Sequence, residues 1–244
     1  MSSGIWVAAS GAVARQAELD ATANNLANAT TTAYKADDAV FHEHLVRAAH
    51  AGRNVNQMRL VSVREIRPDF GVGPVQVTNR PLDVAITDDS FFAVRTPNGE
   101  RYTRSGNFQV ASDGRLTTAE GLTALDSQRK PVRVSATAAD LRIDNEGNVW
   151  ADGSIAGKLR VVRFPRVQAL EKEGHLLFRA TPASGRPRET AGQLASGALE
   201  GSNMSVVKGM TEIVSASRAF DALEKAIQAF RDADRRAATD LMRS

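Results

Sequence analysis

The two ends of this chain have the pattern of long helices and the middle does not, and this contrast constrains the fold more than any other feature. No proline occurs from Ser3 to about Ala29, where small and apolar residues recur. A spacing of seven places side chains on one face of a helix. Because this stripe is narrow and rich in alanine, it favours close approach by another helix over cover of a broad core. The residues seven apart are Ile5, Ala12, Leu19 and Leu26.

The C-terminal segment from Ser205 to Leu241 has the same character and also lacks proline. We expect Asn203 to be the N-cap of this helix, because its amide oxygen can accept an orphan backbone N–H just after the breaker Gly201. A helix of this length spans about 55 Å. Its stripe, in steps of three, four or seven, comprises Val206, Met210, Ile213, Ser217, Phe220, Ile227 and Phe230, widened by Val214, Leu223 and Ala226.

Between the ends the hydrophobic period changes from 3.5 to 2, which is typical of strands. The runs "PLDVAI", "FFAVRT", "RYTRSGNFQV" and "KLRVVRF" are separated by the turn clusters "PNG", "SDG" and "NEG". The pairs Asn98-Gly99 and Asp113-Gly114 predict hairpins, since their residues tolerate positive φ. Many short strands with frequent turns predict an all-β unit from about Val75 to Leu199.

The sequence thus predicts an α+β fold, in which an N-terminal helix (1–33) and a C-terminal helix (200–244) pair as a discontinuous, coiled-coil-like domain. A β-rich middle domain (75–199) is inserted between them. Residues 34–74 have mixed periodicity and predict an extended connector with one short helix or hairpin. Two helices side by side cannot bury both faces of such stripes, so we expect further helices from other copies or related chains to cover them.

Composition excludes several classes of protein. Hydrophobic content of 42% and charged content of 24% are ordinary for a folded soluble protein. The net charge of +3 is small and basic and acidic residues are interspersed, so nucleic acid is not an expected partner. The absence of cysteine excludes disulfides, thiolate zinc sites and cysteine nucleophiles. No segment approaches the roughly 18 apolar residues of a membrane span, and no basic region precedes the apolar N-terminal stretch, so we expect neither membrane insertion nor a cleavable signal peptide.

Three blocks of sequence resemble a known family. "ANNLANATTTAYK" (23–35) is similar to the N-terminal signature of flagellar axial proteins, the rod and hook family. "RPLDVAITDDSFFAV" followed by "YTRSGNFQVASDGRLTTAEGLTAL" resembles the central block of that family, and "LASGALEGSNMSVVKGMTEIVSASRAFDA" its C-terminal block. The length and the single modest β unit favour the two mid-sized rod proteins, and the opening favours the proximal over the distal one.

The resemblance implies a structural subunit of the bacterial flagellar basal-body rod, which polymerises through its terminal helices and transmits torque. It implies export by the flagellar type III apparatus, a place in the rod crossing the periplasm, and no cofactor. The implied partners are self-copies, the proximal and distal rod subunits and the surrounding ring bushing. The alternatives are the distal rod protein and, from a different class, a secreted β-domain binding module with a helical dimerisation stalk.

The chain departs from the family pattern at three turns. Ala33 stands where glycine is usual, which puts a positive-φ turn there in doubt. Asn79 replaces a glycine before Arg80, a tolerable exchange because asparagine also visits the left-handed region. "DDS" (88–90) replaces a glycine-rich turn, and Asp88 or Asp89 could serve as the turn residue through an Asx bond.

Three asparagines close together in the first helix are poor helix formers, which raises the question of their role. Asn24, Asn25 and Asn28 point in different directions around the helix. One hypothesis is that their amides set the register between neighbouring chains. The other is that they fray the helix end near Asn28 and favour its exit. The predicted subunit-interface residues are Ile5, Ala12, Leu19, Asn24, Asn25, Leu26, Asn28, Val206, Met210, Ile213, Phe220, Ile227 and Phe230.

No pattern of residues predicts catalysis or metal binding. "SVVK" (205–208) matches a nucleophile motif, but a helix-opening serine explains it. "DNEGN" (144–148) lacks calcium-loop spacing and predicts a hairpin turn, and "GVGPV" (71–75) is no dinucleotide fingerprint. His42, His44 and His50 with Glu43 lack a nearby fourth ligand, because His175 is far away in the sequence. We therefore expect no catalytic, cofactor or metal site, and hence no enzyme.

Overall fold

The computed structural model describes residues 3–47, 57–135, 138–174 and 176–241. The chain forms two compact units. The helical unit comprises Met1–Ala27, Asp37–Arg67 and Ser205–Ser244, and the β unit comprises Asn28–Ala36 and Pro68–Met204. The fold is α+β, as predicted, with a helix at each end of the chain and a β-rich middle.

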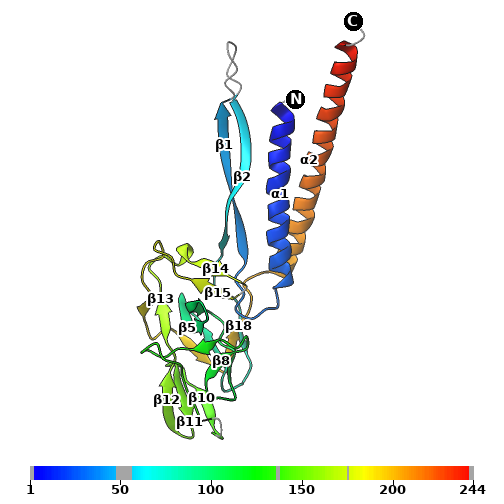
Figure 1. Cartoon of the computed structure of the whole chain (residues 1–244). Helices are drawn as coiled ribbons and strands as arrows, with labels where there is room; N and C mark the ends of the chain where they lie inside the picture. The colour runs from blue at the N-terminus through cyan, green and yellow to red at the C-terminus, as the bar shows by residue number, and fades with distance from the viewer. Residues whose placement is uncertain (1–2, 48–56, 136–137, 175, 242–244) are drawn as a thin grey trace. The chain divides into compact units, whose positions relative to one another are not determined.

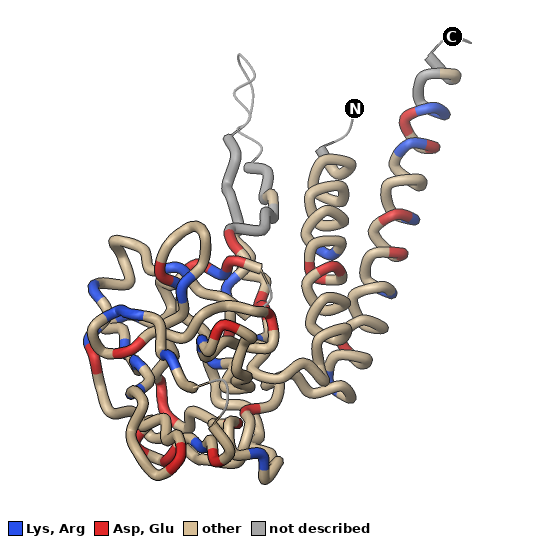
Figure 2. Tube along the Cα trace, turned by 60° about the horizontal axis from the view of Figure 1, so that its bottom comes forward, with Lys and Arg blue, Asp and Glu red and all other residues tan. Residues whose placement is uncertain are grey.

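The helical unit contains both long helices, α1 (Ser3–Ala27) and α2 (Val206–Leu241), which lie side by side (Figures 1 and 2). The second helix begins after Ser205, whose Oγ accepts a hydrogen bond from the Lys208 N–H at a donor–acceptor distance of 3.5 Å. The reading of "SVVK" as the start of a helix is therefore confirmed. The prediction that Asn203 is the N-cap was wrong, because its side chain forms hydrogen bonds with the backbone of the β unit and not with α2.

The segment predicted as an extended connector contains two long strands, β1 (Asp37–Arg47) and β2 (Gln57–Pro68), which pair in a two-stranded sheet (Figure 1). The predicted domain boundaries grouped this segment separately, whereas residues 37–67 belong to the helical unit. Asn25 connects the strands to α1, since its amide exchanges two hydrogen bonds with the backbone of Asp37.

The β unit is built around a nine-stranded sheet of order β14-β15-β6-β5-β9-β8-β7, with β13 pairing β5 and β16. The neighbouring strands of this sheet pair antiparallel, as short hairpin connections require. Its strands are β5 (Ser90–Thr96), β6 (Gly99–Thr103), β7 (Phe108–Val110), β8 (Leu116–Thr118), β9 (Thr123–Ala124), β13 (Val161–Arg163), β14 (Glu171–Glu173), β15 (Leu177–Arg179) and β16 (Arg188–Glu189).

Three smaller sheets complete the β unit. They are β10-β11-β12 (Leu141–Ile143, Asn148–Ala151, Ser154–Lys158), β17-β4 (Leu194–Ser196, Val84–Ile86) and β18-β3 (Ala198–Glu200, Val75–Val77), and a short 3₁₀ helix, η1, spans Val167–Ala169.

The central strand β5 separates two hydrophobic cores. Successive side chains of a strand point to opposite faces, so Phe91 and Phe92 enter different clusters. Phe91 packs edge-on against Phe178, with ring centroids 5.7 Å apart. Phe92 packs edge-on against Phe108 at 5.3 Å. The consecutive phenylalanines of the "FFAV" run thus contribute to both cores of one unit.

The predicted turns are present. Thr96 pairs with Gly99 across the hairpin between β5 and β6, and Gly99 has φ +105. Gly114 has φ +76 in the turn between β7 and β8. The "DNEGN" segment joins β10 to β11 through the Asp144 side chain, which accepts hydrogen bonds from the N–H groups of residues 146 and 148. The hairpin reading of this segment is confirmed.

The turns form at all three positions where the sequence departs from the family pattern. Ala33 adopts φ 59, so the doubt about a positive-φ turn without glycine was wrong. Asn79 has φ 58, as its tolerance of the left-handed region predicted. Asp88 forms the expected Asx bond, because its Oδ1 accepts the Ser90 N–H at 3.1 Å.

Candidate functional site

The two helices contact each other along a strip of small residues, here called the helix seam (Gly4, Ala8, Gly11, Ala12 and Ala216). A Cβ atom added at Gly4 would come within 2.7 Å of the Phe230 ring, and one at Gly11 within 3.3 Å of Leu223. The later glycine, Gly11, meets the earlier residue of α2, Leu223, and both pairs are spaced by seven residues. The two helices are therefore antiparallel. Ala8, Ala12 and Ala216 are buried. Small residues allow this close approach, as the alanine-rich stripe predicted.

The predicted interface residues divide between this seam and the outside of the helical unit. Ala12 is buried and Ile5, Leu19 and Leu26 are half-buried on α1. On α2 the half-buried members are Ile213, Phe220 and Ile227, and the exposed members are Val206, Met210 and Phe230. The stripe read from the sequence is thus used partly inside the chain.

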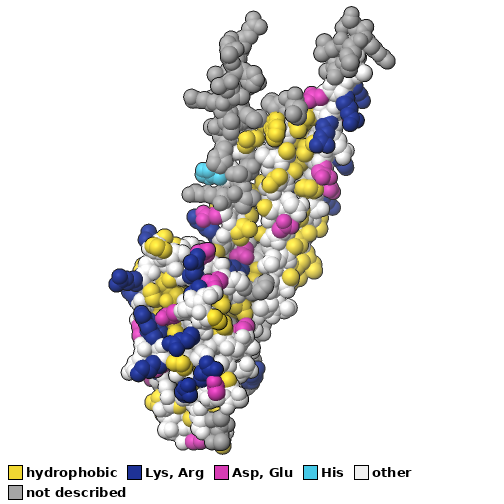
Figure 3. Space-filling model, viewed as in Figure 1, with side chains coloured by type: hydrophobic (Ala, Val, Ile, Leu, Met, Phe, Trp, Pro, Cys, Tyr) yellow, Lys and Arg dark blue, Asp and Glu magenta, His cyan; other side chains and the backbone are white. Residues whose placement is uncertain are grey.

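Several large apolar side chains remain exposed on the helices, and here they are called the exposed apolar rows. Trp6 and Val13 are seven residues apart on α1, and their exposed fractions are 55% and 70%. Val207 and Val214 have the same spacing on α2, with 76% and 50%. Figure 3 shows hydrophobic side chains along the helices. The full rows are Trp6, Val7 and Val13 on α1 and Val206, Val207, Met210, Val214 and Phe230 on α2.

Trp6, Val7, Val13 and Val207 were missed by the sequence reasoning, which followed a single stripe on each helix. Their signal was a second apolar repeat of seven, offset from the first by one residue. Such a repeat lies on a different face of the same helix. Both faces of the helices are therefore apolar, whereas a surface helix of an isolated domain normally has one polar face.

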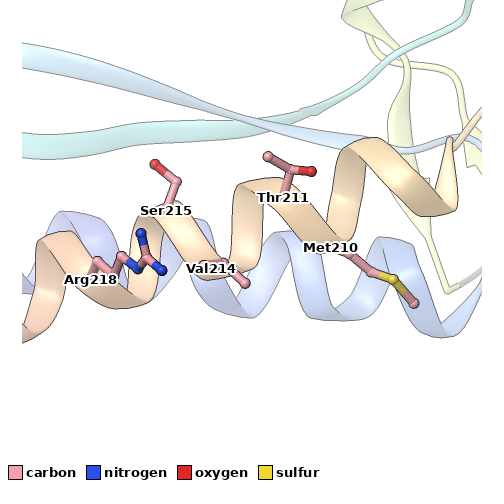
Figure 4. Close-up of a pocket in the computed structure, with 5 residues that line it drawn as sticks. All are labelled: Met210, Thr211, Val214, Ser215 and Arg218. Carbon is pink, nitrogen blue, oxygen red and sulfur yellow. The ribbon is translucent and has the colours of Figure 1, made fainter.

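Part of the row on α2 borders an open hollow of about 460 Å³, shown in Figure 4. Met210, Val214 and Arg218 follow each other at intervals of four, and Thr211 and Ser215 form a second such pair beside them. Residues four apart lie one turn above each other. The hollow therefore has apolar side chains with an arginine at one end and hydroxyl groups along one side.

Charge is unevenly distributed between the helices (Figure 2). Between Ser3 and Ala27 the only charged residues are Arg15, Glu18 and Asp20, and Arg15 pairs with Glu18 at 2.6 Å. The C-terminal third of α2 carries many charges of both signs. Phe230 lies opposite Gly4, close to the start of α1, so α2 continues beyond α1 with this charged stretch.

The three asparagines have different roles. Asn25 is buried, its Oδ1 accepts the Asp37 N–H at 2.8 Å, and its Nδ2 donates to the Asp37 carbonyl at 2.9 Å. Its amide is therefore used within the chain, contrary to the register hypothesis. Asn28 follows the last residue of α1 and accepts a hydrogen bond from Thr31 at 3.2 Å, as the helix-exit hypothesis predicted. Asn24 is exposed, so a contact with a neighbouring chain stays a prediction for this residue.

The described part of the chain contains no group of three or more His, Asp or Glu side chains placed to hold a metal ion. His42 is exposed, the side chains of Glu43 and His44 are outside the described residues, and so are His50 and His175. Neither α1 nor α2 has an apolar stretch suited to crossing a membrane.

Three family models match the chain. Residues 5–35 match the flagella basal body rod protein model, residues 85–151 the D1 domain of the flagellar hook protein FlgE/F/G, and residues 195–240 the C-terminal model of flagellar basal body rod FlgEFG proteins. Two models therefore lie over the helices and one over the β unit, in the order that the sequence blocks predicted.

Similar full-length proteins are found in several bacteria. The chain is 31% identical to the flagellar basal-body rod protein FlgG of Borreliella burgdorferi, over 92% of this chain and 93% of that protein. It is 28% identical to the flagellar basal-body rod protein FlgF of Caulobacter vibrioides, over 92% of each. It is 28% identical to the flagellar hook-basal body complex protein FlhO of Bacillus subtilis, over 99% of each.

Proposed function

Because this chain belongs to the flagellar basal-body rod protein family, we propose that its exposed apolar rows are the surfaces through which subunits join in the rod. The protein is a structural subunit of the bacterial flagellar basal-body rod, and its relatives are structural proteins and not enzymes. The alternative of a secreted binding module has no support among these relatives.

The observation that carries the proposal is the apolar character of both faces of each helix. The helix seam uses one face of α1 and one of α2. The other faces bear the exposed apolar rows except Phe230, which lies at the seam against Gly4, and the side chains of the rows are between 38% and 76% exposed. A soluble monomer gains nothing by exposing them, and contiguous exposed apolar surface is typical of interaction sites. Helices from neighbouring subunits would supply the missing cover.

The size of the possible gain indicates how many neighbours are needed. Burying the exposed half of a large apolar side chain contributes about 1 kcal/mol, so one set of rows contributes roughly 8 kcal/mol. Association costs an estimated 4–15 kcal/mol of lost freedom and ordering, on the order of the gain. A single neighbour thus yields weak binding, whereas several neighbours in a helical wall yield a stable polymer. This favours a subunit that stays monomeric until it reaches a growing rod.

In the rod, the helix pair would serve as a discontinuous, coiled-coil-like domain that joins copies. Torque would be transmitted through many helix contacts. The partners would be self-copies, the proximal and distal rod proteins and the ring bushing, with delivery by the flagellar type III export apparatus into the periplasm. Similarity to FlgF supports the proximal position and similarity to FlgG supports the distal one.

Charge insertion into the exposed apolar rows tests the proposal. Val13→Glu on α1 and Met210→Glu on α2 place a carboxylate where a neighbour would bury it, and an unpaired buried charge is strongly unfavourable. Both sites are exposed, so the monomer should fold normally. We expect each variant to lose swimming and to be absent from purified basal bodies. The matched control is Val77→Glu, at a 74% exposed valine of the β unit.

The controls separate assembly from folding and export. Far-UV circular dichroism of the purified monomers should be unchanged, and the variants should still be exported. The proposal fails if Val13→Glu and Met210→Glu are incorporated into basal bodies at the wild-type level. Removal of about the last 35 residues, roughly the helix expected from its period, should likewise abolish incorporation.

A further inference from the structure

Three charged side chains are completely buried together in the β unit. Lys35 lies in the segment that follows α1, Glu200 ends β18, and Arg104 lies between β6 and β7. Their side chains have no exposed area. Lys35 and Glu200 are 165 residues apart in the chain. We call these three residues the junction cluster, because Lys35 and Glu200 lie on the segments that connect the β unit to the helices.

Glu200 is the centre of the junction cluster. Its Oε1 accepts hydrogen bonds from Lys35 Nζ at 2.7 Å and from the Gly73 N–H at 2.9 Å. Its Oε2 accepts one from Arg104 Nε at 2.9 Å. Lys35 Nζ also donates to the Gly71 carbonyl at 2.6 Å, and Arg104 Nη2 donates to the Asp88 carbonyl. One carboxylate therefore binds two cations and one backbone N–H, and the cations in turn bind two backbone carbonyls.

Two cations share the carboxylate of Glu200, and all three side chains are fully buried. Burial lowers the pKa of Lys35, and the nearby Arg104 adds to this effect, while the attraction of Glu200 opposes it. Arg104 Nη1 has no hydrogen-bond partner among the described residues. Such an arrangement is a poor source of stability compared with apolar packing, but loss of its one anion would leave both cations uncompensated.

Hydrogen bonds of the backbone and of the Asn203 side-chain amide join the same two segments around the cluster. The Ala33 N–H donates to the Glu200 carbonyl at 2.7 Å. The Ala36 N–H donates to Asn203 Oδ1 at 2.8 Å, and Asn203 Nδ2 donates to the Asp69 carbonyl at 2.9 Å. A Cβ at Gly73 would lie 2.2 Å from the Gly201 carbonyl oxygen, so only glycine allows the segments to pass this closely. This explains why Asn203 does not cap α2.

We propose that the junction cluster is a conformational device that ties the segment leaving α1 to the segment entering α2, and so raises the effective concentration of the two helices for pairing. The tie lies entirely within the β unit. It acts in the single chain and therefore does not depend on how subunits contact one another in the rod.

Chain length shows why such a tie matters. Gly11 and Leu223 meet in the helix seam although 212 residues separate them in the sequence. With the tie between Ala33 and Glu200 closed, 22 residues separate Gly11 from Ala33 and 23 separate Glu200 from Leu223. Shortening the connecting chain this much raises the effective concentration about tenfold for a flexible chain.

Engineered cysteines measure this effective concentration directly. The native chain has no cysteine, so Gly11→Cys with Leu223→Cys gives one possible disulfide across the helix seam. Its equilibrium against glutathione in dilute monomer reports how often the helices meet. In this background we compare Glu200→Gln, Lys35→Met, the Glu200→Gln/Lys35→Met pair and Asn203→Ala. Val149→Ala, in the core of the β unit away from the cluster, is the control for a general loss of stability.

We expect Glu200→Gln and Asn203→Ala to lower the effective concentration, Glu200→Gln by about tenfold, while Val149→Ala leaves it unchanged. Lys35→Met should have a smaller effect, since Arg104 and Glu200 remain paired. Adding Lys35→Met to Glu200→Gln should recover part of the loss, because it removes one of the two uncompensated cations. Hydrogen exchange of β5 amides verifies that the β unit is folded in each variant.

Two results would overturn the proposal. One is an unchanged effective concentration in both Glu200→Gln and Asn203→Ala with β5 still protected. The other is no recovery in the double variant, which would contradict the role of charge. If Glu200→Gln unfolds the β unit, Lys35→Met decides alone, because it removes a member of the junction cluster while Glu200 stays paired with Arg104. A normal effective concentration in that variant refutes the proposal.

Discussion

At the scale of single residues, Asp144 shows how one carboxylate organises a turn and a side chain. Partial burial raises its pKa, but hydrogen bonds from the Trp150 indole, the Asn148 side chain and the backbone outweigh this and lower the pKa to about 2. The indole Nε1 donates at 2.8 Å, and the Arg142 guanidinium lies over the ring at 4.8 Å. The turn and the tryptophan are therefore held by the same ionised group.

We predict that Asp144→Asn lowers the free energy of unfolding by about 1 kcal/mol near neutral pH, after allowance for solvent screening. The folded pKa is depressed, so the stabilisation is present above the unfolded value of 3.8 and is lost as the pH falls to about 2. Urea unfolding should thus depend less on pH in this acidic range for the variant than for the wild type.

The control for this prediction is Asp140→Asn, a nearby acidic residue whose carboxylate makes no hydrogen bond with the described residues. It should unfold like the wild type near neutral pH. Equal acid dependence of the wild type and Asp144→Asn would show that the hydrogen bonds to Asp144 contribute nothing.

At the scale of elements, a hydrophobic repeat predicts that a segment is helical but does not identify the face that packs against another helix. The seven-residue repeats of α1 and α2 predicted helices and close packing. They did not show which face of each helix meets the other, because α1 carries two offset apolar repeats. Steric detail decides this: glycines and alanines of α1 lie against Leu223, Phe230 and the side of α2 that contains the buried Ala216.

We predict that Ala216→Leu, at the 2% exposed position of the helix seam, destabilises the helix pair by about 1–3 kcal/mol. The larger side chain has no space, although leucine favours helix almost as strongly as alanine. Thermal melting followed by far-UV circular dichroism should show a lower midpoint for the helical signal. Ala222→Leu, an exposed position on the same helix, should melt like the wild type. Identical melting of both variants would mean that the seam is not closely packed in solution.

At the scale of the whole molecule, the helical and β units differ in what each can bury alone. The β unit has two hydrophobic cores with fully buried phenylalanines. The helical unit has a seam of small residues, whose burial contributes little, and exposed apolar rows. Since helices gain most of their stability from packing, the helical unit should be the less stable one in a lone monomer.

We therefore predict that hydrogen exchange in dilute monomer is much faster in α1 and α2 than in β5, and that the helices become protected in the assembled rod. Native-state exchange with mass spectrometry on monomer and on purified basal bodies measures both. Strong protection of Ile5 to Leu26 in the monomer would contradict this expectation, because the helices would then be stable without neighbours.

The sequence by itself determined the elements: helix at both ends from the heptad spacing, hairpins from Asn98-Gly99 and Asp113-Gly114, and one family from three blocks in order. These features depend on neighbours close in the chain, which a pattern contains. Only the tertiary structure decided that Asn203 bonds to the β unit, that Asn25 holds Asp37, and that β1 and β2 pair. It also brought Lys35 to Glu200, 165 residues away, because burial and hydrogen-bond partners over such separations depend on the folded chain and leave no periodic signal.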